Sequence, residues 1–271
     1  MSSVLSMSLD LPRYAASPRN VARAGDLWRV AQEAAVRAST EVGWPPERYV
    51  EEGTGFVVYE VAARHSREVK NGETLTAHTW IRDVRRRMLS RREVRLDDAQ
   101  GERVFAATQH WVHVASNLRP LRASDAMVAA FPPVEVDDPE VILEDLAPSP
   151  PLGERTFSFE VWHTWIDPNR HVNHPTYVDF CDEAIGRIAA EAGADPQGIV
   201  PLAERVVWKS GAVGGDRISI RSHWYAVGDP GGDAVRFEQE HRLADGTLLA
   251  RATAIRRHVE CLGLSWLPTP R

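Results

Sequence analysis

One short segment of the sequence gathers several side chains that could take part in catalysis. Residues 165–177 read Trp-Ile-Asp-Pro-Asn-Arg-His-Val-Asn-His-Pro-Thr-Tyr, so a carboxylate, two amides and two imidazoles fall within eight residues. Asp167 could act as a general base on water or as a nucleophile. His171 could orient or share the proton, and Asn169 could hold the water or the substrate. This combination predicts attack on a carbonyl group.

A strand and a helix are expected to hold these groups in place. Residues 157–161 alternate apolar and polar side chains, which is the pattern of a strand. A helix is predicted from about Pro175 to Gly193, because Pro suits the first turn and Gly a helix end. Free N–H groups at its start could stabilise a developing oxyanion. Its apolar residues lie on one stripe, formed by Tyr177, Phe180, Cys181, Ala184, Ile185, Ile188 and Ala192.

The sequence also contains an internal repeat. A shift of 150 sets residues 33–43 on 183–193 with five of eleven positions identical, and a shift of 145 sets 101–114 on 246–259 with five more identities. We interpret this as a duplicated domain, with chance matching of Ala-rich helices as the alternative. The first-half partner of the polar segment, residues 17–24, lacks the Asp and the His, which predicts a single site.

Each half shows the same order of a short strand, a helix and several strands, with a first-half helix expected at about residues 26–42. This order predicts an α+β fold in which each half wraps an antiparallel sheet around one long helix. We expect an N-terminal domain at residues 1–133 and a C-terminal domain at 154–271 that carries the polar segment. The Pro-rich, acidic stretch 134–153 between them is predicted to be a linker with a short turn of helix near 140–145.

Composition narrows the classes of protein. The 271 residues carry a net charge of −6, which argues against general nucleic-acid binding, and no apolar run is long enough to span a bilayer. Two cysteines make no disulfide framework, so a cytoplasmic protein is expected. Three histidines, His163, His171 and His174, give only a weak metal signal, and neither a metal nor another cofactor is predicted.

The spacing Asp167-x-Asn169-x-His171-Val-Asn173-x-x-x-Tyr177 resembles the signature of acyl-acyl-carrier-protein (acyl-ACP) thioesterases, which are fused double hot-dog proteins. His174 departs from that signature, where a second Asn is usual. The first half is similar to the family as well, in the segments 55–61, 72–80, 86–92 and 106–112. The resemblance covers roughly residues 8 to 260.

This resemblance implies a tandem hot-dog fold and hydrolysis of an acyl thioester carried by acyl carrier protein or coenzyme A, by a monomer or a homodimer. It makes Asp167, Asn169 and His171 the expected catalytic residues. The family's Glu-Cys pair is absent from the strand at 206–216. Its absence disfavours a cysteine nucleophile and leaves Asp167 as the preferred base.

Other roles remain open for several of these residues. Asp167 and Asn169 could merely turn the chain before the helix, and His171 could be structural. Cys181 is expected in the core, and His174 at the helix start. Residues expected to bind substrate are Asn173, Tyr177, Arg86 and Arg91. The last two belong to a basic cluster, Arg85, Arg86, Arg87, Arg91, Arg92 and Arg95, that could instead be a solvated hairpin.

Two other functions are weighed against hydrolysis. A hot-dog hydratase or dehydratase usually has five steps from Asp to His, whereas Asp167 and His171 are four apart. A non-catalytic acyl-binding protein would have no need of the Asp, Asn and His together. Hydrolysis is therefore the favoured prediction, with the acyl group unspecified.

Overall fold

The computed structural model describes residues 4–145, 150–227, 233–261 and 263–268. Its contacts divide the chain into two compact units. The first comprises residues 1–15 and 26–142, and the second comprises 16–25 and 143–271. None of the described helices has the length and apolar character needed to cross a membrane.

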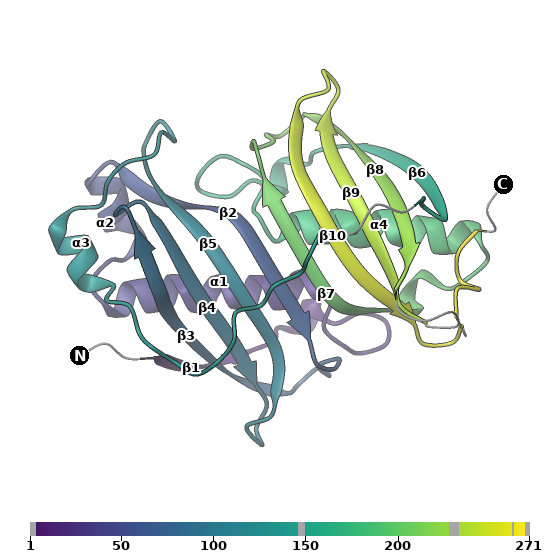
Figure 1. The fold of residues 1–271 in the computed structure, drawn as a ribbon, viewed down its shortest axis with the longest axis horizontal. Coiled ribbons are helices and arrows are strands. Elements are labelled where there is room, and N and C mark those ends of the chain that lie inside the picture. The colour runs from purple at the N-terminus through teal and green to yellow at the C-terminus, as the bar shows by residue number, and fades with distance from the viewer. Residues whose placement is uncertain (1–3, 146–149, 228–232, 262, 269–271) are drawn as a thin grey trace. The chain divides into compact units, whose positions relative to one another are not determined.

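The first unit is one antiparallel sheet with a long helix against it. Its strands run in the order β1-β3-β4-β5-β2. The buried face of α1 includes Ala31, Ala34 and Ala38. Figure 1 shows α1 behind the strands of this sheet. The elements are β1 (Leu5–Asp10), η1 (Arg13–Ala15), α1 (Ala24–Glu41), α2 (Pro46–Glu51), β2 (Thr54–His65), β3 (Thr74–Arg85), β4 (Leu89–Asp97), β5 (Arg103–Ala115) and α3 (Asp125–Ala130).

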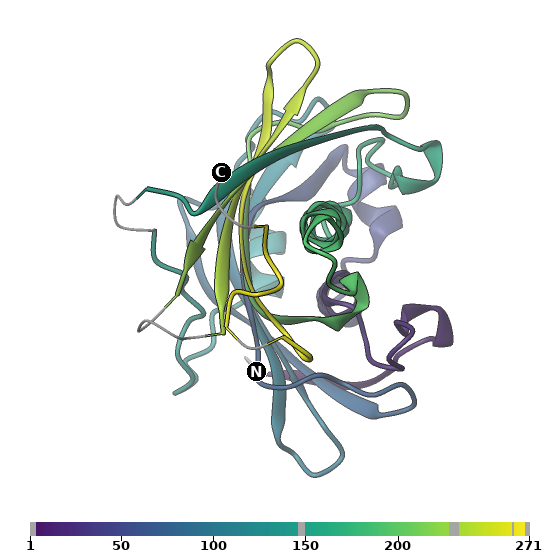
Figure 2. The same cartoon turned by 90° about the vertical axis from the view of Figure 1, so that its right-hand side faces the viewer.

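The second unit repeats this plan with strand order β7-β10-β9-β8-β6, again antiparallel. Figure 2 looks almost along α4, which lies in the hollow of its curved sheet. Ile185, Ile188 and Ala189 of the helix pack into a core with Trp224, Phe237 and Trp266. The elements are β6 (Gly153–Glu160), η2 (His163–Trp165), α4 (Thr176–Glu191), η3 (Pro196–Gly198), β7 (Ile199–Trp208), β8 (Arg217–Ala226), β9 (Val235–Leu243) and β10 (Leu248–His258).

Matching contacts in the two units confirm the internal repeat. In the first unit, Thr108 Oγ1 donates to Glu93 Oε2 across strands β5 and β4 at 2.7 Å. In the second, Thr253 Oγ1 donates to Glu238 across β10 and β9 at 3.0 Å. Thr108 and Thr253 are 145 residues apart, which is the predicted shift. Both predicted helices also form, each ending within two residues of its expected limits.

The predicted turn of helix near residues 140–145 is wrong: these residues form no helix. Residues from α3 to Ile142 instead cross the face of the first sheet that lies away from α1 (Figure 1). Asp138 accepts hydrogen bonds from Arg95 and Arg103, Glu140 pairs with Arg91, and the Val141 N–H donates to Thr108 Oγ1 at 2.8 Å. These contacts with the sheet take the place of helical ones. The sequence did not reveal the short helices α2 and α3. Ser124, the cap of α3, accepts from the Met127 N–H.

Asp138 should stabilise the first unit, because it is bound to the almost completely buried guanidinium of Arg95. Replacing Asp138 by Asn is expected to lower the free energy of unfolding by about 2 kcal/mol, since Arg95 keeps Glu93 as a second partner. Burial alone would raise the pKa of Asp138, but Arg95 and Arg103 hold it below its usual value. The difference between the variant and the wild type should therefore be full above about pH 4 and vanish as Asp138 protonates below it. Denaturant unfolding measures both, with the exposed neighbour Asp137→Asn as the matched control.

Candidate active site

The polar segment predicted from sequence forms a closed loop between η2 and α4. Ile166 and Val172 face each other in an isolated antiparallel bridge. Within it, the Asp167 N–H donates to the His171 carbonyl at 2.9 Å and the Arg170 N–H to the Asp167 carbonyl at 2.9 Å. Arg170 has φ of +64°, which lets the chain reverse in this short span. The loop thus holds its side chains on a hydrogen-bonded main chain.

This loop brings the three expected catalytic residues together. Asp167 Oδ1 accepts from the main-chain N–H of Asn169 at 2.8 Å and from that of His171 at 3.4 Å. Asp167 Oδ2 has one long contact among the described residues, 3.5 Å to Asn169 Nδ2. One carboxylate oxygen is therefore anchored while the other is left for a water molecule or a substrate. Asp167 and His171 are partly exposed and Asn169 is exposed.

The loop does not depend on the carboxylate for its shape. In the repeat partner, the Ser17 N–H donates to the Val21 carbonyl and the Asn20 N–H to the Ser17 carbonyl, both at 2.8 Å. Ala16 and Ala22 form the corresponding bridge, and Asn20 has φ of +59°. The same main-chain turn is thus built with a serine where the second half has Asp167. The closure of this main-chain turn therefore does not require an aspartate.

The expectation of free donors at the start of α4 is wrong for the first turn. The N–H groups of Thr176, Tyr177 and Val178 donate to the carbonyls of the three residues Asn173, His174 and Pro175 at 2.9 to 3.2 Å. The helix begins with a tightened turn that satisfies its own donors. An oxyanion would have to be stabilised by other groups of the loop, of which the Asn169 side-chain amide is one.

Asn173 and Tyr177 help to build the loop and the packing behind it. The Asn173 N–H donates to the Trp165 carbonyl at 3.0 Å. Tyr177 is 1% exposed, and its ring centroid lies 6.0 Å from that of Trp208 and 5.6 Å from that of His241. Burial raises the pKa of its hydroxyl. As placed, Tyr177 is packed behind the loop and its hydroxyl stays protonated.

Cys181, on the buried face of α4, lies in the core as predicted. Its Sγ lies 3.6 Å from Nε2 of the fully buried His241. Burial raises the pKa of the Cys181 thiol and lowers that of His241 to about 3, so both groups are uncharged at neutral pH. This pair is ill suited to provide a thiolate nucleophile.

The arginines expected to bind substrate lie on the β3–β4 hairpin of the first unit, and they differ in their surroundings. Arg91 is partly buried, donates to Asp83 at 2.6 Å and pairs with Glu140. Arg86 is exposed at the tip of the hairpin with φ of +53°. Within the described part of the chain, Arg86 makes no hydrogen bond or ion pair. Only Arg86 therefore has its guanidinium available without breaking an ion pair.

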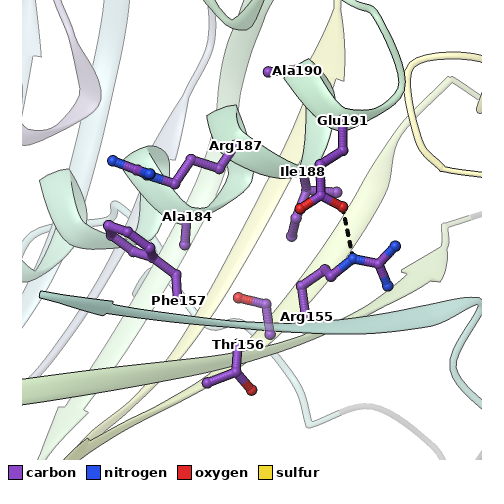
Figure 3. A pocket seen from close by; sticks show the side chains of 9 residues that line it. Arg155, Thr156, Phe157, Ala184, Arg187, Ile188, Ala190 and Glu191 are labelled. Atoms are coloured by element: carbon purple, nitrogen blue, oxygen red, sulfur yellow. Dashed lines mark hydrogen bonds and ion pairs between the residues drawn. The ribbon is translucent and has the colours of Figure 1, made fainter.

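A pocket of about 470 Å³ opens elsewhere in the second unit, between α4 and the edge strand β6 (Figure 3). The guanidinium of Arg187 stacks 3.9 Å over the ring of Phe157, and Arg155 pairs with Glu191 at 2.7 Å. No residue of the polar loop lines this pocket. It is therefore separate from the candidate active site.

The sequence predicted a strand at 206–216, but β7 ends at Trp208. Residues 209–216 form a loop that packs against the polar loop. The Val172 N–H donates to the Ala212 carbonyl at 2.9 Å. Gly211 lies directly against the ring of His171, and Gly214 lies against the ring of His163. The spacing of these two glycines was a signal in the sequence, but it identifies no contact without the fold.

Comparison with known proteins agrees with this fold. The chain is similar over its length to solved structures of three thioesterases, although the sequence identities are low. A candidate oleoyl thioesterase from Lactobacillus plantarum is 19% identical with a TM-score of 0.80, covering 96% of this chain and 98% of that one. An acyl-ACP thioesterase from Bacteroides thetaiotaomicron is 14% identical with a TM-score of 0.72, covering 94% and 98%. The 12:0-ACP thioesterase from Umbellularia californica is 18% identical with a TM-score of 0.72, covering 94% of each.

These likenesses define the class of fold as a tandem hot-dog, in which each half wraps a sheet around one helix. Residues 3–131 match the family model described as the acyl-ACP thioesterase N-terminal domain. No curated protein matches the chain. The chain is therefore similar to the acyl-ACP thioesterases, in sequence over residues 3–131 and in fold over nearly its whole length.

The buried His241 should make the second unit sensitive to mild acid. Its pKa is about 3 in the folded chain and about 6.5 when unfolded, so the unfolded state gains a proton below pH 6.5 that the folded state does not. Stability should therefore be full above that pH and fall by on the order of 2 kcal/mol by pH 5. A His241→Gln variant should lose this slope in denaturant unfolding measured across that range. Equal slopes for variant and wild type would contradict the assignment.

Proposed function

We propose that the protein hydrolyses acyl thioesters of acyl carrier protein at the loop of residues 166–175. Asp167 is the general base, and Asn169 and His171 assist it. The observation that carries this proposal is the comparison of the two halves. Both build the same main-chain loop, but only the second half places an aspartate, an amide and an imidazole on it.

The protein is proposed to act in the cytoplasm. Its two cysteines are free thiols, as is usual in that reducing compartment.

In the proposed reaction, Asp167 Oδ2 takes a proton from water while the water oxygen attacks the thioester carbon. The Asn169 side chain donates to the carbonyl oxygen as negative charge develops on it. The tetrahedral intermediate then collapses, the carbon–sulfur bond breaks, and the proton passes through His171 to the departing thiolate. The products are a free acid and a thiol. Cys181 is not involved, because it is buried and protonated.

The first half suggests which substitution of Asp167 should leave the loop intact. Asp167→Ser copies Ser17, which occupies the same place in the same turn. We expect thioester hydrolysis to fall by about 10²- to 10⁴-fold, the usual contribution of a general base, with an unchanged melting temperature. A thiol-release assay with acyl-carrier and acyl-coenzyme A substrates of several chain lengths measures this effect.

Ser17→Ala is the matched control and should leave turnover unchanged. Full activity of Asp167→Ser would contradict the role given to Asp167. Absence of thiol release from every substrate of the wild-type protein, together with hydration of an enoyl thioester, would instead support a hydratase.

The exposed Arg86 is proposed to attract the acidic carrier protein. Because rim charges act mainly on encounter, Arg86→Gln should raise KM for an acyl-carrier substrate about fivefold at low salt, and little at high salt. Arg37→Gln, on the exposed face of α1, is the control. An equal rise in KM for acyl-coenzyme A would assign Arg86 to the coenzyme phosphates, and no change for either substrate would remove it from the binding surface.

A further inference from the structure

Two histidine rings rest on glycines of the loop that follows β7. A side-chain Cβ built on Gly211 would lie 2.4 Å from Cδ2 of His171, and one built on Gly214 would lie 2.3 Å from Nδ1 of His163. Both distances are far below van der Waals contact. Any residue other than glycine at these places would therefore displace an imidazole or the loop itself.

The main chain of this loop does not itself demand the two glycines. Of the glycines at 211, 214 and 215, only Gly215 has a left-handed φ, of +87°. An alanine could adopt the backbone conformations of Gly211 and Gly214. The requirement for glycine at these two positions comes from the neighbouring rings.

The first half contains the same loop with side chains at both positions. Strand register makes Ala63 the partner of Val206, because they pair with the repeat-related Ala107 and Ala252. The same shift of 143 residues sets residues 66–73 on 209–216. Gly72 has φ of +86°, like Gly215.

The hydrogen bonds of these two loops match as well. Glu73 accepts from the Lys70 N–H at 2.7 Å, and Asp216 accepts from the Val213 N–H at 2.8 Å. The main-chain bonds from Glu73 to Lys70 and from Asp216 to Val213 are both 3.2 Å long. The loop fold is therefore the same in both halves.

At the positions of Gly211 and Gly214, the first-half loop has Glu68 and Asn71. The first half also lacks both histidines, since Val21 and Arg13 stand at their places in the shift of 150. The half that has the two histidines therefore also has the two glycines, and the half that lacks the histidines has larger residues in place of the glycines.

We propose that Gly211 and Gly214 are positioning residues whose lack of a side chain lets the rings of His171 and His163 pack against them, and that His163 is a further residue of the active site. The positions of the two glycines are fixed by main-chain hydrogen bonds of the loop. The Gly215 N–H donates to the Val161 carbonyl, the Val161 N–H donates to the Asp216 carbonyl, and Ala212 accepts from Val172, at 2.8 to 2.9 Å. Gly211 thereby sets where the His171 imidazole stands relative to Asp167. This inference rests on the proposed function of the loop.

A double-mutant cycle tests whether Gly211 acts through His171. Gly211→Ala should lower kcat by about 10- to 100-fold, the cost of displacing a catalytic group by about an ångström, with little change in KM or melting temperature. In a His171→Ala background the same substitution should cost nothing more, because the ring it displaces is gone. Gly214→Ala with His163→Ala forms a second cycle with the same expectation.

Two matched controls accompany the cycles. Gly55→Ala adds a methyl group in open space at a glycine without positive φ, and Glu68→Ala changes the corresponding loop of the first half. Neither should change kcat. Full activity of Gly211→Ala, or a loss that adds undiminished to that of His171→Ala, would overturn the positioning role. Full activity of His163→Ala would remove His163 from the site.

The imidazole signals in an NMR pH titration separate this inference from the proposed function. Gly211→Ala should move the His171 resonances and leave those of distant histidines in place. If His171→Ala is fully active but the His171 resonances move in Gly211→Ala, the catalytic role of His171 is contradicted and the positioning role of Gly211 is supported. If His171→Ala is inactive but these resonances do not move in Gly211→Ala, the positioning role is contradicted and the catalytic role is supported.

Discussion

The main-chain closure of the loop at residues 166–172 is the interaction on which the candidate active site depends. Two hydrogen bonds and one bridge hold Asp167 and His171 in a fixed span between η2 and α4. Because the backbone satisfies itself, the side chains need not maintain the turn. One carboxylate oxygen is anchored by main-chain donors, and the other is left with a single long contact among the described residues. A rigid backbone with an available carboxylate oxygen suits general-base chemistry.

The two halves of the chain share their fold but differ in the side chains on two matching loops. Both halves retain the sheet, the helix, the Thr–Glu pair across the strands and two matching loops. The side chains on those loops differ in a coordinated way: serine becomes aspartate, valine becomes histidine, and the residue facing that histidine becomes glycine. The first half thus serves as an internal reference for what the fold alone requires. The residues assigned to the reaction are among those by which the second half departs from it.

The basic stretch and the acidic linker also have to be understood together. Taken separately, the basic cluster suggested either a docking surface or a solvated hairpin, and the acidic stretch suggested a linker with a short turn of helix. In the fold, Arg91 and Arg95 bind Glu140 and Asp138, so most of this opposite charge is used to hold the linker on the sheet. Arg86 at the hairpin tip is left out of this network among the described residues. The proposed attraction of an acidic partner is therefore assigned to Arg86, which is exposed, and not to the paired Arg91 or Arg95.

The sequence by itself determined the two helices, the repeat and the loop bearing Asp167, Asn169 and His171. Helical periodicity, turn residues and motif spacing depend on neighbours along the chain, and these are visible in the sequence. Only the tertiary structure decided that residues 134–142 lie against the sheet without helix, that the first N–H groups of α4 are already bonded, and that Gly211 faces His171. Such contacts join residues that are more than 30 positions apart, or depend on how a local turn closes, and no periodicity records them. Packing therefore decided which of the available polar groups could act.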